Sequence, residues 1–509
     1  MGRSALACVS VALATSVSGA ARGQACEAIP TFADGLTPTR VLHVAPGGSN
    51  ATGTGSASNP YATIAFAAGL ATPGTRVVVG AGTYAGGGFL NDVRGTATAP
   101  IWIGGDGTMP MPVIEGGSEG LHLVRPRYVV LENLEVRGAS SNGINCDDGG
   151  EHANPDAARF LVFRRLWIHD IGGTGNQDGL KLSGVNDFVV LDAAISRCGG
   201  ANSGSGIDMV GCHRGVIARS TFSELSGNAV QAKGGSEDIE VRRCTMTEAG
   251  QRAVNMGGST GFEFFRPPLS ISQPNFEARN IRVVSSVIVG SEAPAAYVGC
   301  VDCVVANNTI ITPHSWVMRI LQETVTSGGY TFLPASGGRF VNNIVYFDRA
   351  DLSTFVNVGA NTSPQTFVFQ NNLWYARDNP GASTPTLPTP ETGGIVGLDP
   401  RFADAQFGYY LLRWESPARR AGVGPGPSGG DRNGICYASP PSIGAHQFCY
   451  ANCDTTAGLI YLAVSDFVCF NNQFVAGSLY ANCDESTSPP VLNILDFVCF
   501  IERFARGCP

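Results

Sequence analysis

The chain has 509 residues, of which 66 are glycine, 30 are proline and only 15% are charged. Its formal net charge of −8 at pH 7 argues against nucleic acid as a partner, because nucleic-acid binding requires a basic surface. Short Val/Ile/Phe-rich runs separated by Gly/Asn/Ser turns favour a mainly β protein over a helical one.

Residues 1–25 have the pattern of a secretory signal peptide. Arg3 gives a basic start, Ala5–Val17 is apolar, and small residues follow as far as Ala25. The apolar run is too short to span a membrane, and no later segment has about 20 uninterrupted apolar residues. We therefore expect a secreted or cell-surface-associated protein without a membrane span. Cys26 leaves a lipid anchor as an alternative, although the residues before it form a poor lipobox.

Fourteen cysteines follow the predicted cleavage site, eight in residues 26–436 and six in residues 449–508. An even number in an oxidising compartment predicts disulfides, although their connectivity cannot be deduced from the sequence. Cys300 and Cys303 have the spacing of a redox or metal-binding pair, but we interpret them as a structural pair at a turn.

The first structured segment runs from Asn59 to Tyr84. A short apolar helical turn at residues 65–71 precedes the β-run at residues 73–79 and a glycine turn. The exposed end of a stack of β-coils needs a cap, and this helical turn could supply it. The segment resembles the N-terminal part of proteins of the pectin-lyase-like superfamily, which implies a short capping helix before the first coils.

Repeats then follow at regular intervals. Short strands begin at Gly179, Gly206, Ala229 and Ala253, with spacings of 27, 23 and 24 residues, and further β-runs lie between them. Three short strands in a repeat of roughly 22 to 27 residues are typical of one coil of a parallel β-helix. No long amphipathic helices alternate with the strands, as a Rossmann-type fold would require. We predict that residues 26–448 form a right-handed parallel β-helix.

One insertion interrupts the repeats, at residues 257–276. It carries Phe262, Phe264, Phe265 and Arg266. Insertions in repeat proteins map to loops on one face, often the binding face. Farther on, residues 399–445 resemble the terminal segment of many secreted bacterial β-helix proteins.

Residues 449–509 contain an internal duplication with a spacing of 30 residues. Tyr-Ala-Asn-Cys-Asp occurs at 450 and again at 480, and Asp-Phe-Val-Cys-Phe occurs at 466 and again at 496. Each half reads as an acidic loop followed by an amphipathic helix. This arrangement resembles the dockerin duplication, most closely a cysteine-containing variant that ends in Gly-Cys. The resemblance implies a small α-helical anchoring module with a protein or surface partner.

The same resemblance implies EF-hand-like calcium loops in both halves. Their candidate ligands are oxygen donors, which suit a hard cation such as Ca²⁺: Asn482, Asp484, Asn493 and Asp496 in the second half, and Asn452, Asp454 and Asp466 in the first. Ala463 stands where the second half has Asn493, so the first half lacks one donor. The alternative is a metal-free module crosslinked by the local pairs Cys453–Cys469 and Cys483–Cys499.

Polar residues are expected to gather on one strand face of the β-helix. Alternate side chains of a strand face opposite ways, and adjacent coils stack about 4.8 Å apart. If Leu180, Ile207, Val230 and Val254 point into the core, the residues after them form an outward ladder: Lys181, Asp208, Gln231, Asn255 and, past the insertion, Arg319. Lys233 faces the same way. Lys181 and Lys233 are the only lysines of a chain that otherwise uses arginine.

These groups suit β-elimination in a uronic-acid polysaccharide. Removing the proton α to the sugar carboxylate needs a base, a partner that neutralises the carboxylate, and positioning groups. A desolvated lysine beside an arginine can lose its proton near neutral pH, whereas arginine cannot. Lys233 is the candidate base, with Arg252 and Arg319 as candidate carboxylate or oxyanion partners. The candidate substrate-binding residues are Lys181, Asp208, Asn228, Gln231, Asn255, Phe265, Arg266, Glu292, Tyr297, Trp316 and Glu323.

Residues 231–255 resemble β-helix lyases of the alginate lyase and chondroitinase B type, in which a strand lysine is followed one coil later by an arginine. The resemblance implies a polysaccharide lyase and calcium at the β-helix cleft. The sequence departs from that pattern, because the arginine position falls on Asn255 while Arg252 lies three residues earlier. Ser226 and Asn228 stand where the acidic calcium ligands would be.

Other interpretations remain open at this point. Lys181 and Asp208 can form an exposed ion pair of little energetic weight, and asparagine ladders can have a purely structural role. A glycoside hydrolase would need two or three converging carboxylates, of which the ladder offers Asp208 alone. A non-catalytic glycan-binding or surface protein is the third class, and the fold does not decide among them.

Overall fold

The computed structural model describes residues 26, 28–173, 175–200, 203–352, 354–456 and 462–508. The predicted signal peptide, residues 1–25, lies outside the described residues. The chain divides into two compact units, Cys26–Phe448 and a second that includes Cys449–Pro509. Among the described helices, none has the length and apolar character needed to cross a membrane.

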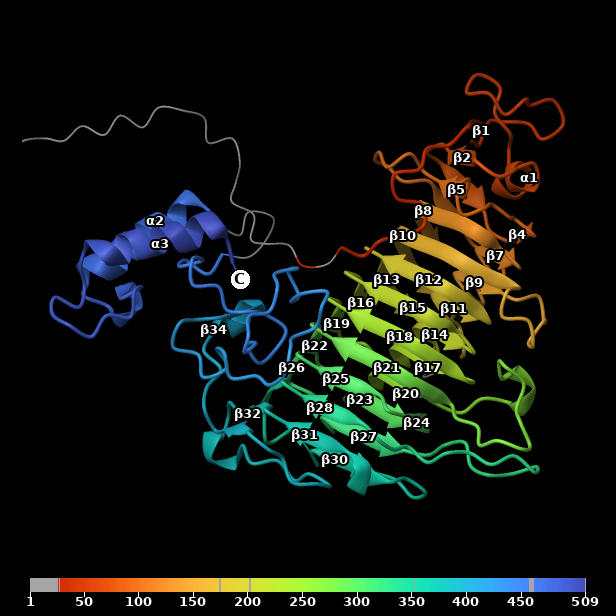
Figure 1. The fold of residues 1–509 in the computed structure, drawn as a ribbon. Coiled ribbons are helices and arrows are strands. Elements are labelled where there is room, and N and C mark those ends of the chain that lie inside the picture. The colour runs from red at the N-terminus through yellow and green to blue at the C-terminus, as the bar shows by residue number, and fades with distance from the viewer. Residues whose placement is uncertain are drawn as a thin grey trace, which may run out of the picture. The chain divides into compact units, whose positions relative to one another are not determined.

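The first unit is a right-handed parallel β-helix (Figure 1). One of its walls is a parallel sheet of ten strands, one from each successive coil, which we call the ladder sheet. Its strands are β4 (Gly88–Asn91), β7 (Leu121–Val124), β9 (Ile144–Asp147), β11 (Leu180–Ser183), β14 (Ser205–Val210), β17 (Asn228–Lys233), β20 (Arg252–Gly257), β23 (Ala293–Val298), β27 (Met318–Leu321) and β30 (Val356–Val358).

The other two walls share two long strands that pair in both of them, β8 (Arg127–Arg137) and β10 (Ala158–Ile171). One wall also contains β1 (Arg40–Val44), β2 (Thr75–Val79), β5 (Ile101–Gly104), β12 (Val185–Leu191), β15 (His213–Ala218), β18 (Ser236–Arg242), β21 (Ala278–Val284), β24 (Cys300–Val301), β25 (Val304–Ala306), β28 (Arg339–Val341) and β31 (Val368–Gln370). The other contains β3 (Thr83–Ala85), β6 (Val113–Glu115), β13 (Ala194–Cys198), β16 (Thr221–Ser223), β19 (Thr245–Thr247), β22 (Val287–Val289), β26 (Thr309–Ile311), β29 (Ile344–Phe347), β32 (Leu373–Ala376) and β33 (Ile395–Val396).

The predicted N-terminal capping helix is present as α1 (Ile64–Gly69). The Thr63 hydroxyl accepts a hydrogen bond from the Phe66 amide and caps the first turn. Ile64, Ala67 and Ala68 are buried, and the helix packs against β1, β2 and β4 at the first coils (Figure 1). At the other end, residues 399–448 add the antiparallel pair β34 (Phe402–Asp404) and β35 (Tyr409–Leu412). Short 3₁₀ turns are η1 (Phe262–Phe264), η2 (Pro364–Thr366), η3 (Pro380–Ala382) and η4 (Ala405–Phe407).

A continuous apolar core fills the space between the three walls. The residues predicted to point inward are all buried in it: Leu180, Ile207, Val230 and Val254. An amide ladder also runs through the buried interior, because the Asn308 side chain donates to Asn343 and the Asn343 side chain donates to Asn372, at 3.1 and 3.0 Å. Asparagine therefore does have a structural role in this β-helix, on coils at the C-terminal end of the stack.

Arginine–aspartate pairs connect adjacent coils where the walls meet. Arg214 makes two hydrogen bonds of 2.7 and 3.1 Å to Asp187, and Arg219 makes two of 2.8 and 2.7 Å to Asp192. All four residues have positive φ angles between 53° and 57°, so the pairs mark bends of successive coils: Asp187 and Arg214 lie within β12 and β15, and Asp192 and Arg219 directly follow these strands. The planar guanidinium group matches a carboxylate in this two-bond geometry, which the lysine amino group cannot do. This geometry explains the use of arginine at these bends.

The cysteines of the first unit correct the expectation of general disulfide formation. Cys26 and Cys436 form a disulfide, which excludes a lipid on that Cys26 thiol. Six others are buried free thiols: Cys146, Cys198, Cys212, Cys244, Cys300 and Cys303. Their side chains fill the core between coils, where cysteine packs as a small apolar residue. Burial raises the pKa of Cys212 to about 12, so this thiol is unreactive in the folded protein.

The second unit contains α2 (Val464–Val475), the 3₁₀ turn η5 (Leu479–Ala481) and α3 (Ile494–Arg506). Its disulfides are Cys449–Cys508, Cys453–Cys469 and Cys483–Cys499, and the last two are the local pairs considered from the sequence. Residues 30 positions apart stack on each other, Tyr450 on Tyr480 and Phe470 on Phe500, with ring centroids 4.8 and 4.2 Å apart. The duplicated halves therefore pack face to face around a small aromatic core.

Candidate functional site

The register of the ladder sheet places the predicted polar residues in one row. Lys181 is aligned with Asp208, Asp208 with Gln231 and Gln231 with Asn255 on consecutive strands. Arg319 follows two strands later, after Ala296. The same row continues toward the N-terminus through Asn145, His122 and Phe89. Lys233 lies in the parallel row two residues farther along the strands, aligned with Val210.

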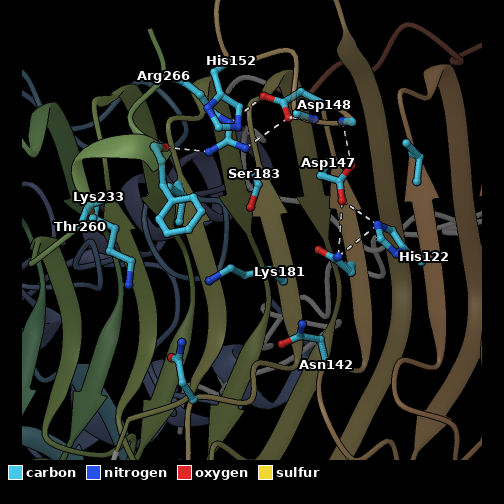
Figure 2. Close-up of a pocket in the computed structure, with 18 of the residues that line it drawn as sticks. His122, Asn142, Asp147, Asp148, His152, Lys181, Ser183, Lys233, Thr260 and Arg266 are labelled. Atoms are coloured by element: carbon cyan, nitrogen blue, oxygen red, sulfur yellow. Dashed lines mark hydrogen bonds and ion pairs between the residues drawn. The ribbon is translucent and has the colours of Figure 1, made fainter. Parts of the chain in front are cut away.

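A pocket of about 620 Å³ opens on the N-terminal half of this sheet. It lies between the strands, the turn after β9 and the insertion after β20. Its polar lining includes His122, Asn145, Asp147, Lys181, Lys233 and Arg266. Both lysines of the chain therefore line one pocket (Figure 2).

Two buried carboxylates lie beneath the lysines. The Lys181 amino group contacts Asp208 directly and lies 3.3 Å from Asp178, whereas the Lys233 amino group lies 3.6 Å from Asp208. Both carboxylate side chains are only 1% exposed. Lys181 is thus held by two acids, while Lys233 has one more distant partner, Asp208. Within the described residues, Asp208 Oδ1 has no hydrogen-bond partner.

Charge and burial act in opposite directions in this cluster. Burial raises the pKa of Asp178 to about 6, and the charge of Asp208 adds to the effect. Burial also acts to raise the pKa of Asp208, but the ammonium groups of Lys181 and Lys233 outweigh it and the pKa is lowered. For Lys181, burial disfavours the charged form, yet the carboxylates of Asp208 and Asp178 prevail and raise its pKa. Lys181 is therefore a fixed cation and not a base.

A second charged group occupies the N-terminal end of the pocket. His122 Nε2 lies 2.6 Å from an Asp147 oxygen, and His122 Nδ1 lies 2.9 Å from a Glu119 oxygen. Hydrogen bonds to Asp147 and then to Glu119 raise the pKa of His122 to about 9. The imidazole is therefore charged at neutral pH, and its ring is fixed in orientation by both carboxylates.

The insertion is anchored to the pocket by a buried ion pair. Arg266 donates to Asp148 at 2.6 and 3.2 Å and to the Phe264 carbonyl at 2.7 Å (Figure 2). Phe264, 51% exposed, lines the pocket. The prediction that Phe265 contacts substrate is wrong, because this side chain is 2% exposed and packs against Phe332. The sequence thus predicted the aromatic loop correctly, but it did not show that Phe264, and not Phe265, faces the pocket.

Tyr297 is a second correction. Its ring is completely buried in the core, and its hydroxyl donates to the Arg339 carbonyl at 2.9 Å. In the register of β23, Ala296 occupies the outward row, so the next residue points inward. Tyr297 therefore cannot contact a substrate on the ladder sheet.

The two predicted catalytic arginines lie farther along the same face and do not line the pocket. Arg252 pairs with Glu323 at 2.6 Å. The Arg319 guanidinium lies 4.4 Å from the centre of the Trp316 ring. Burial, with the nearby charge of Arg252, lowers the pKa of Arg319. The structure thus brings only Lys233 of the predicted catalytic residues into the pocket.

The remaining predicted binding residues differ in accessibility. Asn228, Gln231 and Asn255 are buried within the sheet face. The Asn228 amide contacts Gln231 at 3.4 Å, and Asn255 accepts a 3.3 Å hydrogen bond from Arg252. Glu292 is exposed and accepts a hydrogen bond of 2.5 Å from the Ser315 hydroxyl. The amides consequently support the sheet more than they offer groups to a ligand.

His122, Asp147 and Phe264 are pocket residues that the sequence interpretation missed. The alternation at residues 121–124 and 144–147 matches that of the later strands, and this signal could have extended the ladder toward the N-terminus. It is obscured because 36 residues separate Ile144 from Leu180, its partner on the next strand.

The loops of the second unit hold the predicted calcium ligands close together. In the second half, Asn482 and Asp484 side-chain oxygens both accept from the Ser486 amide, at 3.1 and 3.0 Å. Asp496 accepts from the amides of Asn493 and Asp484, which brings the loop onto the start of α3. Converging carboxylate and amide oxygens fit a hard cation.

The loop of the first half has similar hydrogen bonds, although Ala463 stands at the position of Asn493. Asp466 accepts from the Ala463 amide at 2.7 Å and from the Asp454 amide at 3.2 Å. Burial raises the pKa of Asp466 to about 6. The Asn452 side-chain oxygen is buried without a hydrogen-bond partner among the described residues. Among these residues, no group of three or more His, Cys, Asp or Glu side chains is placed to hold a metal ion.

Several solved structures are similar to this chain. Pectate lyase Pel9A aligns with 81% of this chain and 98% of its own length, at 15% identity and a TM-score of 0.52. A rhamnogalacturonan lyase covers 74% of this chain and 93% of its own (14% identity, TM-score 0.45), and an alginate lyase from Paenibacillus sp. str. FPU-7 covers 64% and 100% (16% identity, TM-score 0.41). No family model and no curated protein matches the sequence. The similarity to Pel9A shows that the two share the parallel β-helix fold.

Proposed function

We propose that this protein acts on an extracellular polysaccharide and cleaves a uronic-acid-containing chain by β-elimination. The observation that carries the proposal is the placement of both lysines in one pocket on the ladder sheet. Lys181 is fixed as a cation by two buried acids, while Lys233 has one acidic partner among the described residues, Asp208 at 3.6 Å. The Lys181 amino group is thus suited to binding a carboxylate, and the less closely paired Lys233 is the candidate base.

In the proposed reaction, the neutral amine of Lys233 removes the proton on C5 of the uronate. The electron pair of that C–H bond forms the C4–C5 double bond, and the bond from C4 to the glycosidic oxygen breaks. The departing oxygen takes a proton from water, which leaves a free hydroxyl on one product and an unsaturated uronate on the other. The Lys181 ammonium stabilises the negative charge that develops on the sugar carboxylate.

The proposal is tested by following unsaturated product in the ultraviolet on polygalacturonate, alginate and other uronate polymers, with and without calcium. Lys233→Ala should lower the rate by about 10²- to 10⁴-fold, the usual range for loss of a general base. Arg214→Ala, at an exposed position of β15 that does not line the pocket, is the matched control and should retain the wild-type rate.

Other outcomes identify the alternatives. New reducing ends without a double bond would indicate a glycoside hydrolase. Saturable binding of a polymer without any product would indicate a glycan-binding protein. A Lys233→Ala variant that retains full elimination activity would overturn the assignment of the base.

For the second unit, we propose a dockerin-like anchoring module that binds Ca²⁺ and a protein or surface partner. The 30-residue duplication and the converging oxygens of Asn482 and Asp484 support this proposal. Four disulfides in the chain support secretion, because disulfides persist in oxidising compartments.

A further inference from the structure

Phe89 is an exposed aromatic ring on the face of the ladder sheet. It lies in β4, aligned with His122 on the next strand. Its side chain is 55% exposed, although its neighbours Leu90 and Leu121 point into the core. The ring therefore lies on the outer face of the sheet, in the row that continues through His122 and Asn145 to Lys181.

His122 gives this ring a rigid support. The two ring centroids are 4.8 Å apart with planes inclined by 42°. Because Glu119 and Asp147 engage both nitrogens of the imidazole, the His122 ring cannot turn without breaking two charged hydrogen bonds. One side of Phe89 thus rests on a fixed surface while the rest of its ring remains accessible.

The position of the ring relative to the lysines is also defined. Phe89, His122, Asn145 and Lys181 occupy consecutive positions of one row. Three steps of about 4.8 Å place Phe89 about 14 Å from Lys181 along the stack. His122, Asn145 and Lys181 line one pocket, and Phe89 contacts the His122 end of it.

We propose that Phe89, supported by His122, is a stacking subsite for a sugar residue some distance from the bond that is cleaved. The C–H face of a pyranose would lie on the Phe89 ring, since aromatic side chains bury apolar surface with little loss of conformational entropy. The carboxylates of Glu119 and Asp147, which hold the His122 imidazole, would accept hydrogen bonds from sugar hydroxyls next to this subsite. The inference rests on the proposed function, and it adds that longer oligosaccharides bind more tightly than short ones.

The test compares oligogalacturonates and alginate oligosaccharides of two to six sugars. For Phe89→Ala, we expect KM for the hexasaccharide to rise about tenfold with kcat retained, and KM for the shortest cleaved substrate to stay unchanged. Phe89→Trp, which restores a ring, should return KM for the hexasaccharide to near the wild-type value. Phe407→Ala is the matched control, since Phe407 is an exposed phenylalanine in η4 and not on the ladder sheet.

A direct binding measurement separates this inference from the reaction. Calorimetry with the hexasaccharides uses the Lys233→Ala background, in which turnover should be about 10²- to 10⁴-fold slower. A tenfold weaker hexasaccharide affinity on adding Phe89→Ala supports the subsite even if no elimination is ever detected. Equal affinity with and without the Phe89 ring, or the same loss for all chain lengths, overturns it.

Discussion

The two units of this protein use cysteine in opposite ways. The β-helix has one disulfide and six buried thiols, whereas the much smaller second unit has three disulfides and no free thiol among its described residues. The β-helix buries an apolar core that continues through its coils, so its thiols serve as packing groups. A unit of about 60 residues buries too little apolar surface to be stable by packing alone, and covalent crosslinks make up the difference. The size of the core, rather than the compartment, therefore decides how a cysteine is used here.

Removing one crosslink from the small unit should have the largest effect. In Cys483→Ser/Cys499→Ser, we expect the second unit to lose about 2–5 kcal/mol of stability and to unfold at moderate denaturant, because its core cannot compensate. Limited proteolysis with mass spectrometry would follow the two units separately. Cys244→Ala is the control, since it removes a buried thiol and no crosslink. Equal protease resistance of the double variant and the wild type would contradict this view of the second unit.

Calcium should act on the same unit and leave the β-helix core unchanged. A cation that binds the folded loops stabilises them by about 2.7 kcal/mol when its concentration is 100 times its Kd. The change in melting temperature would be measured by thermal unfolding of the second unit with Ca²⁺ and with a chelator. The unfolding is followed by a probe other than tryptophan fluorescence. Asp484→Asn should reduce it, because this residue contributes a carboxylate to the loop. A melting temperature that is the same with Ca²⁺ and with chelator would exclude the calcium loops.

The smallest effect is expected at the bends of the β-helix. Arg214→Lys keeps the charge but loses the two-bond contact with Asp187, so the free energy of unfolding should fall by at most about 1 kcal/mol. Urea unfolding of the wild type and the variant would measure it. Arg506→Lys, in a single exposed contact of α3, is the control in the second unit. A loss of several kcal/mol at Arg214 would mean that these exterior pairs, and not the core, hold the coils together.

The repetitive parts of the fold could be predicted from the sequence because the same alternation of inward and outward side chains recurs in every coil. The alternation of side chains along a strand predicted that Leu180 and Ile207 point inward and that Lys181 and Asp208 point outward. The register of the strands agrees with this prediction. The capping helix at residues 64–69 was also predictable from its apolar turn.

The irregular parts of the site could not be predicted in this way. Whether Phe264 or Phe265 faces the pocket depends on how Arg266 anchors the insertion to Asp148, a contact between residues 118 positions apart. Tyr297 was assigned to the substrate face, whereas Ala296, the residue before it, occupies the outward row of β23. His122 was missed because the coil after Ile144 is unusually long. For His122, a change in loop length hid a pattern that is local and regular, whereas the choice between Phe264 and Phe265 depends on a long-range contact.

The disulfide between Cys26 and Cys436 has a consequence for biosynthesis, since it joins residues 410 positions apart. Because Cys436 is synthesised long after Cys26, the Cys26 thiol has to stay reduced, or exchange partners, until the last coils have been made. Once the bond forms, the entire β-helix is a closed covalent ring. A single protease cut within it leaves both fragments attached, and they separate on a gel only after reduction.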